Sequence, residues 1–156
     1  MGVRLVALLD APYAFESTYT DSIQRPAELW AQRAHSAAVG GEQSILFARA
    51  ADDVIGMAGA YTHPDRRQSR TIWGVWVEAR HRNQGLGAEM VEALASWAST
   101  SGAATVDLWV SESNEPARAL YRKLGFEDTG ERQPFQPNPG IDECRLIRRA
   151  GRGPSA

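Results

Sequence analysis

Hydrophobic and polar positions alternate between strand-like and helix-like patterns from residue 44 onward. Apolar runs rich in β-branched and aromatic residues at 44–50, 54–63, 70–77 and 104–110 predict strands. The run at 70–77, RTIWGVWV, is apolar on both faces and predicts a central strand. Helical spacing predicts a helix over 85–100, carried by Met90, Val91, Leu94, Trp97 and Ala98. This order predicts parallel strands joined by a right-handed crossover.

Turn residues divide the other elements. Asp52-Asp53 suits a tight hairpin turn between the first two strands. A second helix is predicted over 114–124, with Pro116 tolerated in its first turn and Gly125 as a left-handed stop. Strands near 126–132 and 141–148, separated by the loop QPFQPNPG, complete the predicted sheet.

The first 43 residues predict helices rather than strands. VRLVALL at 3–9 is apolar enough for a short helix, and RPAELWAQRAHSAA at 25–38 has helical spacing before Gly40-Gly41. The tail GRGPSA, residues 151–156, has nothing to pack and is predicted to be disordered. With 156 residues in total, we expect a single domain over 1–150.

Composition narrows the class of protein. The formal net charge is -2 and there is no sustained basic block, which argues against general nucleic-acid binding. The lone cysteine, Cys144, cannot form an internal disulfide, and the N-terminus lacks the features of a signal peptide. No apolar run approaches the roughly 20 residues that span a bilayer. We expect a cytoplasmic protein that does not bind membranes.

The stretch RNQGLGA, residues 82–88, lies between a predicted strand and a predicted helix. Free backbone N–H groups and the helix dipole make such a junction suited to an anion, and glycines at 85 and 87 let a diphosphate approach. The alternative is that the glycines only form a tight turn. No G-K-[ST] follows, and Met90 replaces the third glycine of the dinucleotide fingerprint, so another diphosphate ligand is expected.

Two motifs resemble those of the GNAT superfamily of N-acetyltransferases. Val77 through Ala88 fits V-x-x-x-x-R-x-x-G-x-G-A, which is similar to the acyl-CoA pyrophosphate loop of that superfamily. Residues 114–130 resemble its N-x-x-A-x-x-L-Y-x-x-x-G-F signature, matched by Asn114, Ala117, Leu120, Tyr121, Gly125 and Phe126. The resemblance implies an α/β GNAT fold, a mixed sheet of about six strands with helices on both faces.

The resemblance also implies where acetyl-CoA binds. Backbone groups of Trp76 and Val77 would meet the pantetheine amides, in the manner of an added strand where two parallel strands splay. The pyrophosphate would be held by the amides of Arg82, Asn83, Gln84, Gly85, Leu86, Gly87 and Ala88. The Arg82 side chain would add charge near the phosphates, or would be a solvated loop arginine. Asn114 would hydrogen-bond the cofactor, although it is equally explained as a helix N-cap.

Acetyl transfer by direct attack needs a neutral amine, a stabilised tetrahedral oxyanion and a proton for the leaving thiolate. The resemblance assigns the acid role to Tyr121, whose alternative is a core tyrosine. Several relatives place a glutamate where this chain has Thr71, so the base stays open between Glu78, Asp107 and a water chain to bulk. His35, His63 and His81 show no pattern typical of a base or of a metal site, and no metal is expected.

Substrate contacts are expected from aromatic residues. Trp73 and Trp76 stand three apart on one strand, which predicts opposite faces, and Trp109 lies on the neighbouring strand. Trp73, Trp109 and Phe135 are candidate substrate-binding residues, although strand tryptophans are more often core. The loop 132–140 and the segment 15–30 are where relatives usually vary the acceptor site.

The sequence therefore predicts an acetyl-CoA-dependent N-acetyltransferase that acts on the primary amine of a small molecule. One alternative is acetylation of a protein N-terminus or lysine; another is a non-catalytic acyl-CoA-binding regulatory module. Similar proteins usually open with a strand and a long first helix, whereas this chain begins inside that helix. Either the strand is absent or the start is placed late. An exposed edge near 44–50 would favour a homodimer.

Overall fold

A computed structural model describes residues 42–151 of the chain. Six strands and three helical segments follow in order: β1 Gln43–Ala50, β2 Asp53–Thr62, β3 Ser69–Val77, the short 3-10 helix η2 Ala79–His81, α4 Leu86–Thr100, β4 Thr105–Ser111, α5 Glu115–Lys123, β5 Glu127–Pro134 and β6 Asp142–Arg149. The helices expected over 3–9 and 25–38, and the tail 152–156, lie outside the described residues.

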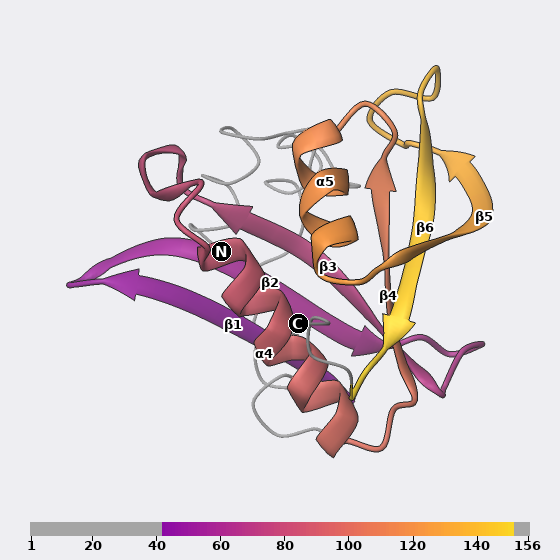
Figure 1. Cartoon of the computed structure of the whole chain (residues 1–156), viewed down its shortest axis with the longest axis horizontal. Coiled ribbons are helices and arrows are strands. Elements are labelled where there is room, and N and C mark those ends of the chain that lie inside the picture. Colours follow the sequence, from indigo (N-terminus) through magenta and orange to yellow (C-terminus); the bar gives the residue numbers. More distant parts are fainter. Residues whose placement is uncertain (1–41, 152–156) are drawn as a thin grey trace, which may run out of the picture.

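The six strands form one mixed sheet with the order β1-β2-β3-β4-β6-β5 (Figure 1). β3 and β4 are parallel, as the strand–helix–strand pattern predicts, and α4 connects them. The other neighbouring pairs are antiparallel. β3 is central in the sheet, so the prediction made from its two apolar faces is confirmed.

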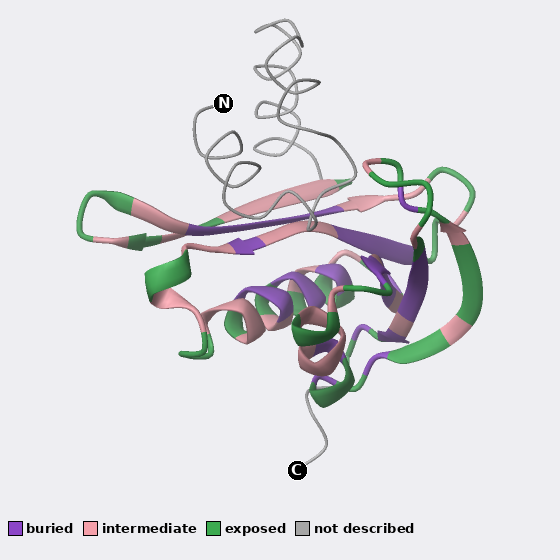
Figure 2. Cartoon of the chain, turned by 90° about the horizontal axis from the view of Figure 1, so that it is seen from above, coloured by how far each residue is buried: buried purple, intermediate pink, exposed green. Residues whose placement is uncertain are grey.

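Helices α4 and α5 cover one face of this sheet (Figure 2). The core between them and the sheet is apolar, and Val91, Leu94, Ala98 and Val106 in it are fully buried. The helical stripe read from the sequence supplies the α4 side of that core, because its residues recur once per turn. We call this face of the sheet the helix face, and the other the opposite face.

A β-bulge in β3 changes which way its tryptophans point. Met57 is the register partner of Trp76, and Gly59 is the partner of Trp73. Because Met57 and Gly59 stand two apart on β2, all four residues point to the same face. The bulge adds one residue to β3 between Trp73 and Trp76. Gly74 lies in this segment and has a positive φ of 62°. The prediction of opposite faces for Trp73 and Trp76 is therefore wrong.

β3 and β4 pair only at the start of their lengths. Their register runs from Ser69↔Thr105 to Ile72↔Leu108, although β3 continues to Val77 and β4 to Ser111. Beyond Ile72 the two strands diverge (Figure 1). We call the part of the sheet between their unpaired ends the β3–β4 opening. Parallel strands that part in this way leave backbone groups of β3 without a neighbouring strand.

Element ends differ slightly from those expected. The first hairpin turns at Ala51 and Asp52, so Asp53 already belongs to β2. β5 extends to Pro134, two residues beyond the expected end, and Pro134 is tolerated because β5 is an edge strand. Gly125 has a φ of +84° and follows α5 as predicted, and Gly102, with the same φ, follows α4. Within residues 42–151, no helix is long and apolar enough to cross a membrane.

Candidate active site

The RNQGLGA loop connects η2 to α4 and contains a row of free amides. None of the backbone N–H groups from residue 83 to 88 donates a hydrogen bond to another described residue. The first intrahelical bond of α4 comes from Glu89 to the carbonyl of Gly85, 3.0 Å away. Gly85 is the N-cap and has a φ of 85°. The loop therefore has the donors and the helix dipole that an anion needs.

One side chain and one glycine set the shape of this loop. The Arg82 Nε atom donates to the carbonyl of Val77 at 2.8 Å, and the residue is half-buried. Arg82 is therefore folded back onto the end of β3 and is not a solvated loop arginine. A Cβ atom at Gly87 would lie 3.5 Å from Leu120 Cδ2 and 3.8 Å from Val77 Cγ2. The end of β3, the first turn of α4 and α5 thus converge at Gly87.

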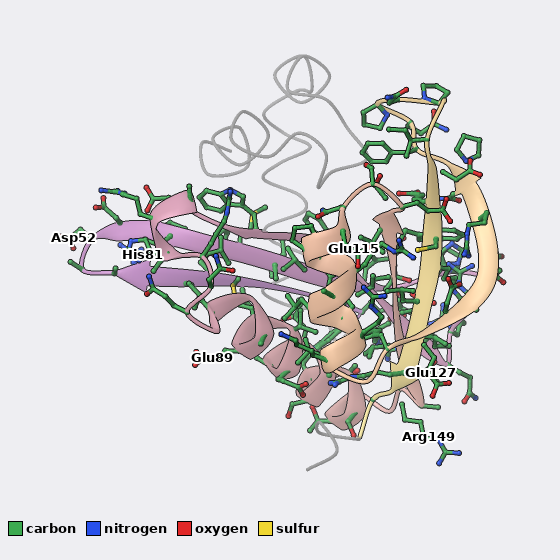
Figure 3. All side chains as sticks on the ribbon, turned by 45° about the horizontal axis from the view of Figure 1, so that its top comes forward. Asp52, His81, Glu89, Glu115, Glu127 and Arg149 are labelled. Atoms are coloured by element: carbon green, nitrogen blue, oxygen red, sulfur yellow. The ribbon has the colours of Figure 1, made fainter. Side chains whose placement is uncertain are left out.

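Asn114 is the N-cap of α5. Its side-chain oxygen accepts a hydrogen bond from the backbone N–H of Ala117 at 3.3 Å. This confirms the capping role, which by itself explains an asparagine at this position. Figure 3 labels Glu89 and Glu115, which mark the first turns of α4 and α5 respectively. A contact between Asn114 and a cofactor stays a prediction.

Tyr121 is buried on the core side of α5. It is 7% exposed, and its ring packs against Phe126 with the centroids 5.7 Å apart in a T-shaped arrangement. Burial raises the pKa of the Tyr121 phenol well above its ordinary value. The hydroxyl group therefore stays protonated at any physiological pH and is suited to donate a hydrogen bond, since burial disfavours the phenolate. A tyrosine that packs in the core can also serve as the acid, so the two interpretations of Tyr121 are compatible.

The strand beside the opening carries the residues predicted to meet pantetheine. Trp76 is buried, and Val77 packs on the helix-face core together with Val75. No residue of β3 after Ile72 has a register partner on β4. The carbonyl of Val77 accepts from Arg82, so this backbone group is already engaged.

The opposite face at the opening is both polar and aromatic. Thr71 of β3 and Asp107 of β4 are register partners, and theirs is the second-to-last pair between the two strands. Trp109 lies two residues after Asp107 on the same strand and therefore shares its face. Trp73 lies over β2, since a Cβ atom on Gly59 would be only 2.5 Å from Trp73 Cε2. The structure thus places Trp73, Trp76 and Trp109 on one face with Thr71 and Asp107.

Asp107 is held in a cluster of charged side chains. It is completely buried, and its Oδ2 atom accepts from Arg145 Nε at 3.1 Å and from Arg145 Nη2. Arg66 Nε lies 3.4 Å from the same oxygen, and Arg145 Nη1 also donates to Glu131. The other carboxylate oxygen, Oδ1, has no hydrogen-bond partner.

The other candidate groups lie apart from this cluster. Glu78 pairs with Arg80 and His81 just after β3, so its carboxylate is engaged in the loop. His63 Nδ1 accepts from the backbone N–H of Asp65. Among the described residues, no three His, Cys, Asp or Glu side chains group as a metal site would require. His35 lies outside the described residues, as does the segment 15–30.

Phe135 follows β5 and is 5% exposed. Its backbone N–H donates to the carbonyl of Ile141 at 2.8 Å, which closes the loop between β5 and β6. Gln133 and the buried Glu143 form a hydrogen bond beside that loop. Phe135 is therefore a packed residue at the base of the loop, and its contact with a substrate stays a prediction.

Sequence reasoning missed Arg145 and Arg66. Both lie outside the recognised motifs, and their partner Asp107 is 38 residues from Arg145 along the chain. The available signal was Arg145 itself, which lies between apolar residues in the strand segment ECRLI. An arginine on a buried strand requires a partner.

Comparisons with curated proteins find acetyltransferases. The L-2,4-diaminobutyric acid acetyltransferase of Shouchella clausii is 29% identical over 83 residues, which cover 53% of this chain and 47% of that protein. The [ribosomal protein bS18]-alanine N-acetyltransferase of Escherichia coli K12 is 36% identical over 77 residues, 49% of this chain and 52% of that protein. The chain thus spans about half the length of these relatives.

Solved structures show the same fold. An acetyltransferase of the GNAT family from Streptococcus pneumoniae superposes with a TM-score of 0.73 at 21% identity, covering 95% of this chain and 93% of that one. The yncA protein of Salmonella typhimurium, solved with its cofactor acetyl-CoA, has a TM-score of 0.65 at 18% identity and covers 83% and 76% of the two chains. The sequence model of the acetyltransferase (GNAT) family matches residues 6–126. The chain belongs to the GNAT family of acetyltransferases.

Proposed function

We propose that this protein transfers an acetyl group from acetyl-CoA to the primary amine of a small molecule. The observation that carries the proposal is the row of free amides from residue 83 to 88 at the N-terminus of α4, next to the β3–β4 opening. A diphosphate fits such a row, because each amide offers a donor that no described residue uses. The chemistry supplied by the bound group is an activated acetyl thioester.

Different residues of the chain have different roles in this reaction. The amides of the RNQGLGA loop bind the diphosphate, and Arg82 keeps the loop against the end of β3. Backbone groups at Trp76 and Val77 line the opening for the pantetheine arm. Tyr121 stays protonated because burial raises its pKa, and its hydroxyl donates to the leaving sulfur; the attacking amine gives up one proton, so the sulfur leaves as the thiol. Asn114 fixes the start of the helix that carries Tyr121.

The residues around the opening bear on the size of the acceptor. On the opposite face, Thr71 and Asp107 are buried at the narrow end of the opening and Trp76 is buried farther along β3, which favours a compact amine. The diaminobutyrate acetyltransferase named above acts on such a molecule. Acetylation of a protein N-terminus is the second candidate, because the bS18-alanine N-acetyltransferase shares 36% identity over the aligned residues.

The first test is acetyl-CoA binding to the purified full chain by calorimetry. Acetyl-CoA and dephospho-CoA should bind with similar affinity, because both contain the diphosphate, and free pantetheine should bind far more weakly. Equal binding of all three would show that the loop holds no diphosphate, and absence of binding would contradict the proposal.

Turnover is then measured as thiol release with L-2,4-diaminobutyrate and with an alanine-starting peptide. We expect transfer to the small amine to be the faster reaction. Faster transfer to the peptide would favour the second candidate, and saturable acetyl-CoA binding with no transfer to any amine would favour a regulatory module.

A homodimer and a cytoplasmic location stay predictions. β1 forms one edge of the described sheet, and Phe47 on it is 54% exposed. Such an edge offers unpaired backbone groups and an apolar side chain to a second copy. Light scattering of the full chain tests the dimer.

A further inference from the structure

Arg148 is a buried arginine on the helix face of β6. It is 6% exposed, and its register partner on β4 is Val106, a residue of the apolar core. Its Nη1 and Nη2 atoms donate to the two carboxylate oxygens of Glu92 on α4, at 2.8 and 2.9 Å. Nη1 also donates to the backbone carbonyl of Leu124 at 2.6 Å. A planar guanidinium group that is bound in this way holds its partners in one fixed geometry.

The carbonyl that Arg148 binds lies at the C-terminal end of α5. Leu124 is the C-cap of this helix, and Gly125 after it has a φ of 84°. The backbone N–H of Phe126 donates to the carbonyl of Tyr121 at 3.0 Å, which completes a Schellman motif. Carbonyl groups at the end of a helix carry partial negative charge, so a cation is favoured there. Arg148 therefore binds the turn that fixes the backbone of Tyr121.

Phe126 provides a second connection between Arg148 and Tyr121. The Cζ atom of Arg148 lies over the Phe126 ring, 5.2 Å from its centroid, as in a cation–π contact. The same ring packs against the ring of Tyr121. Arg148 thus acts on Tyr121 through a backbone carbonyl and through a packed aromatic ring.

Helix α5 depends on such a connection more than α4 does. It has nine residues, of which Tyr121 alone is buried, whereas α4 has 15 residues and buries five of them in the core. A helix of nine residues is marginal without tertiary contacts. Asn114 caps its N-terminus, and the Arg148–Glu92 pair ties its C-terminus to α4. Because α4 begins at the RNQGLGA loop, this pair fixes Tyr121 relative to the loop.

We propose that Arg148, held by Glu92, is a positioning residue that sets the place of the Tyr121 hydroxyl group for acetyl transfer. The proposal rests on the acetyltransferase function proposed above and deepens it. Neither Arg148 nor Glu92 is assigned a contact with the reacting atoms, since both act through the C-terminal turn of α5.

The test variant is Arg148→Lys, which keeps the positive charge but replaces the planar fork with one ammonium group. The matched control is Arg70→Lys. Arg70 is 7% exposed, donates to the carbonyl of Ser101 at the end of α4 at 3.0 Å, and has its Cζ atom 5.8 Å from the centroid of the Trp97 ring. It makes the same kinds of contact as Arg148, but at the end of α4 instead of α5. Each variant is made in the full chain, with Tyr121 and with Tyr121→Phe.

We expect Arg148→Lys to lower kcat about tenfold, since a misplacement of about 1 Å typically costs about 100-fold and the lysine retains part of the link. The KM for the amine and the Kd for acetyl-CoA should stay within about twofold of wild type. In the Tyr121→Phe background, Arg148→Lys should have no further effect on kcat, because the group that it positions is absent. Arg70→Lys should lower the melting temperature as much as Arg148→Lys does and leave kcat unchanged. Thiol release is measured with whichever of L-2,4-diaminobutyrate and the alanine-starting peptide the wild type acetylates faster.

Three results would overturn the proposal while leaving the proposed function in place. They are an unchanged kcat in Arg148→Lys, an equal fall in Arg70→Lys, and a tenfold fall that persists in the Tyr121→Phe background. A Tyr121→Phe variant as active as wild type would overturn it as well. Should Arg148→Lys fail to fold, Glu92→Gln tests the same link from α4, with the same dependence on Tyr121 expected. A wild-type protein that binds acetyl-CoA but acetylates no amine contradicts the proposed function itself, and this proposal with it.

Discussion

The two faces of the sheet at the β3–β4 opening are built in different ways. On the helix face, Val110 and Tyr121 belong to one apolar core against which Val75 and Val77 pack, and the free amides of the loop lie at its margin. On the opposite face, charged side chains are buried around Asp107. At the opening the helix face is held by apolar packing, and its buried ion pair, Arg148 with Glu92, lies away from the opening, whereas the opposite face depends on matched charges. The two faces should therefore respond differently to mutation.

The largest effect is expected on the opposite face, from Arg145→Met. Met retains an unbranched side chain but leaves Asp107 with Arg66 as its remaining cation. Breaking a buried ion pair typically costs about 3–5 kcal/mol, and we expect the lower end, because Arg66 remains. Urea unfolding monitored by circular dichroism measures this loss. The control is Arg132→Met, an exposed arginine paired with Asp128 and Glu112, which should cost far less. Equal losses would show that the cluster does not stabilise the fold.

On the helix face, the largest expected effect is on catalysis. Tyr121→Phe keeps the ring that packs on Phe126 and removes only the hydroxyl. Loss of a general acid typically lowers kcat by about 100-fold or more. The Kd for acetyl-CoA and the melting temperature should hardly change. Steady-state kinetics with the best amine checks this, and a mutant as active as the wild type would remove Tyr121 from the mechanism.

A smaller effect is expected at the margin of the helix face, in the loop. Gly87→Glu places a carboxylate beside the amides that we assign to the diphosphate, and repulsion should weaken acetyl-CoA binding about tenfold. Gly87→Ala is the matched control, because its Cβ would make only ordinary contacts with Leu120 and Val77. Calorimetry compares the two variants. Similar affinities in the glutamate and alanine variants would show that the diphosphate lies elsewhere.

The same contrast explains what the sequence could reveal. The helix face comes from contiguous motifs, since the RNQGLGA loop and the helix of Tyr121 each occupy one short segment. Local patterns therefore predicted the central strand, the parallel pair and both helices. The opposite face comes from register between distant strands. The pairing of Thr71 with Asp107 has no local signal, and the arginine within ECRLI indicates that a partner is needed but not that the partner is Asp107.

A single inserted residue shows how sensitive register is. Strict alternation placed Trp73 and Trp76 on opposite faces, and the bulge at Gly74 returned them to one face. A lone glycine in a strand is a known signal of a bulge, but it does not state which residue is left unpaired. Which residues lie on the opposite face could therefore be determined only from the structure.

That bulge provides the smallest and most specific test. Gly74 has a φ of 62°, a conformation that costs other residues about 1 kcal/mol, so Gly74→Ala should lower stability by about that amount. If the bulge persists, Trp73 and Trp76 stay on the opposite face and KM for the amine hardly changes. If β3 instead slips into regular alternation, Trp76 moves toward the helix face and acetyl-CoA binding falls as well. The free energy of unfolding, the KM for the amine and the Kd for acetyl-CoA are measured on this one variant. Together they show whether Gly74 only relieves backbone strain or also determines which residues lie on each face of the sheet. A stability equal to wild type would mean that the backbone at residue 74 is not left-handed.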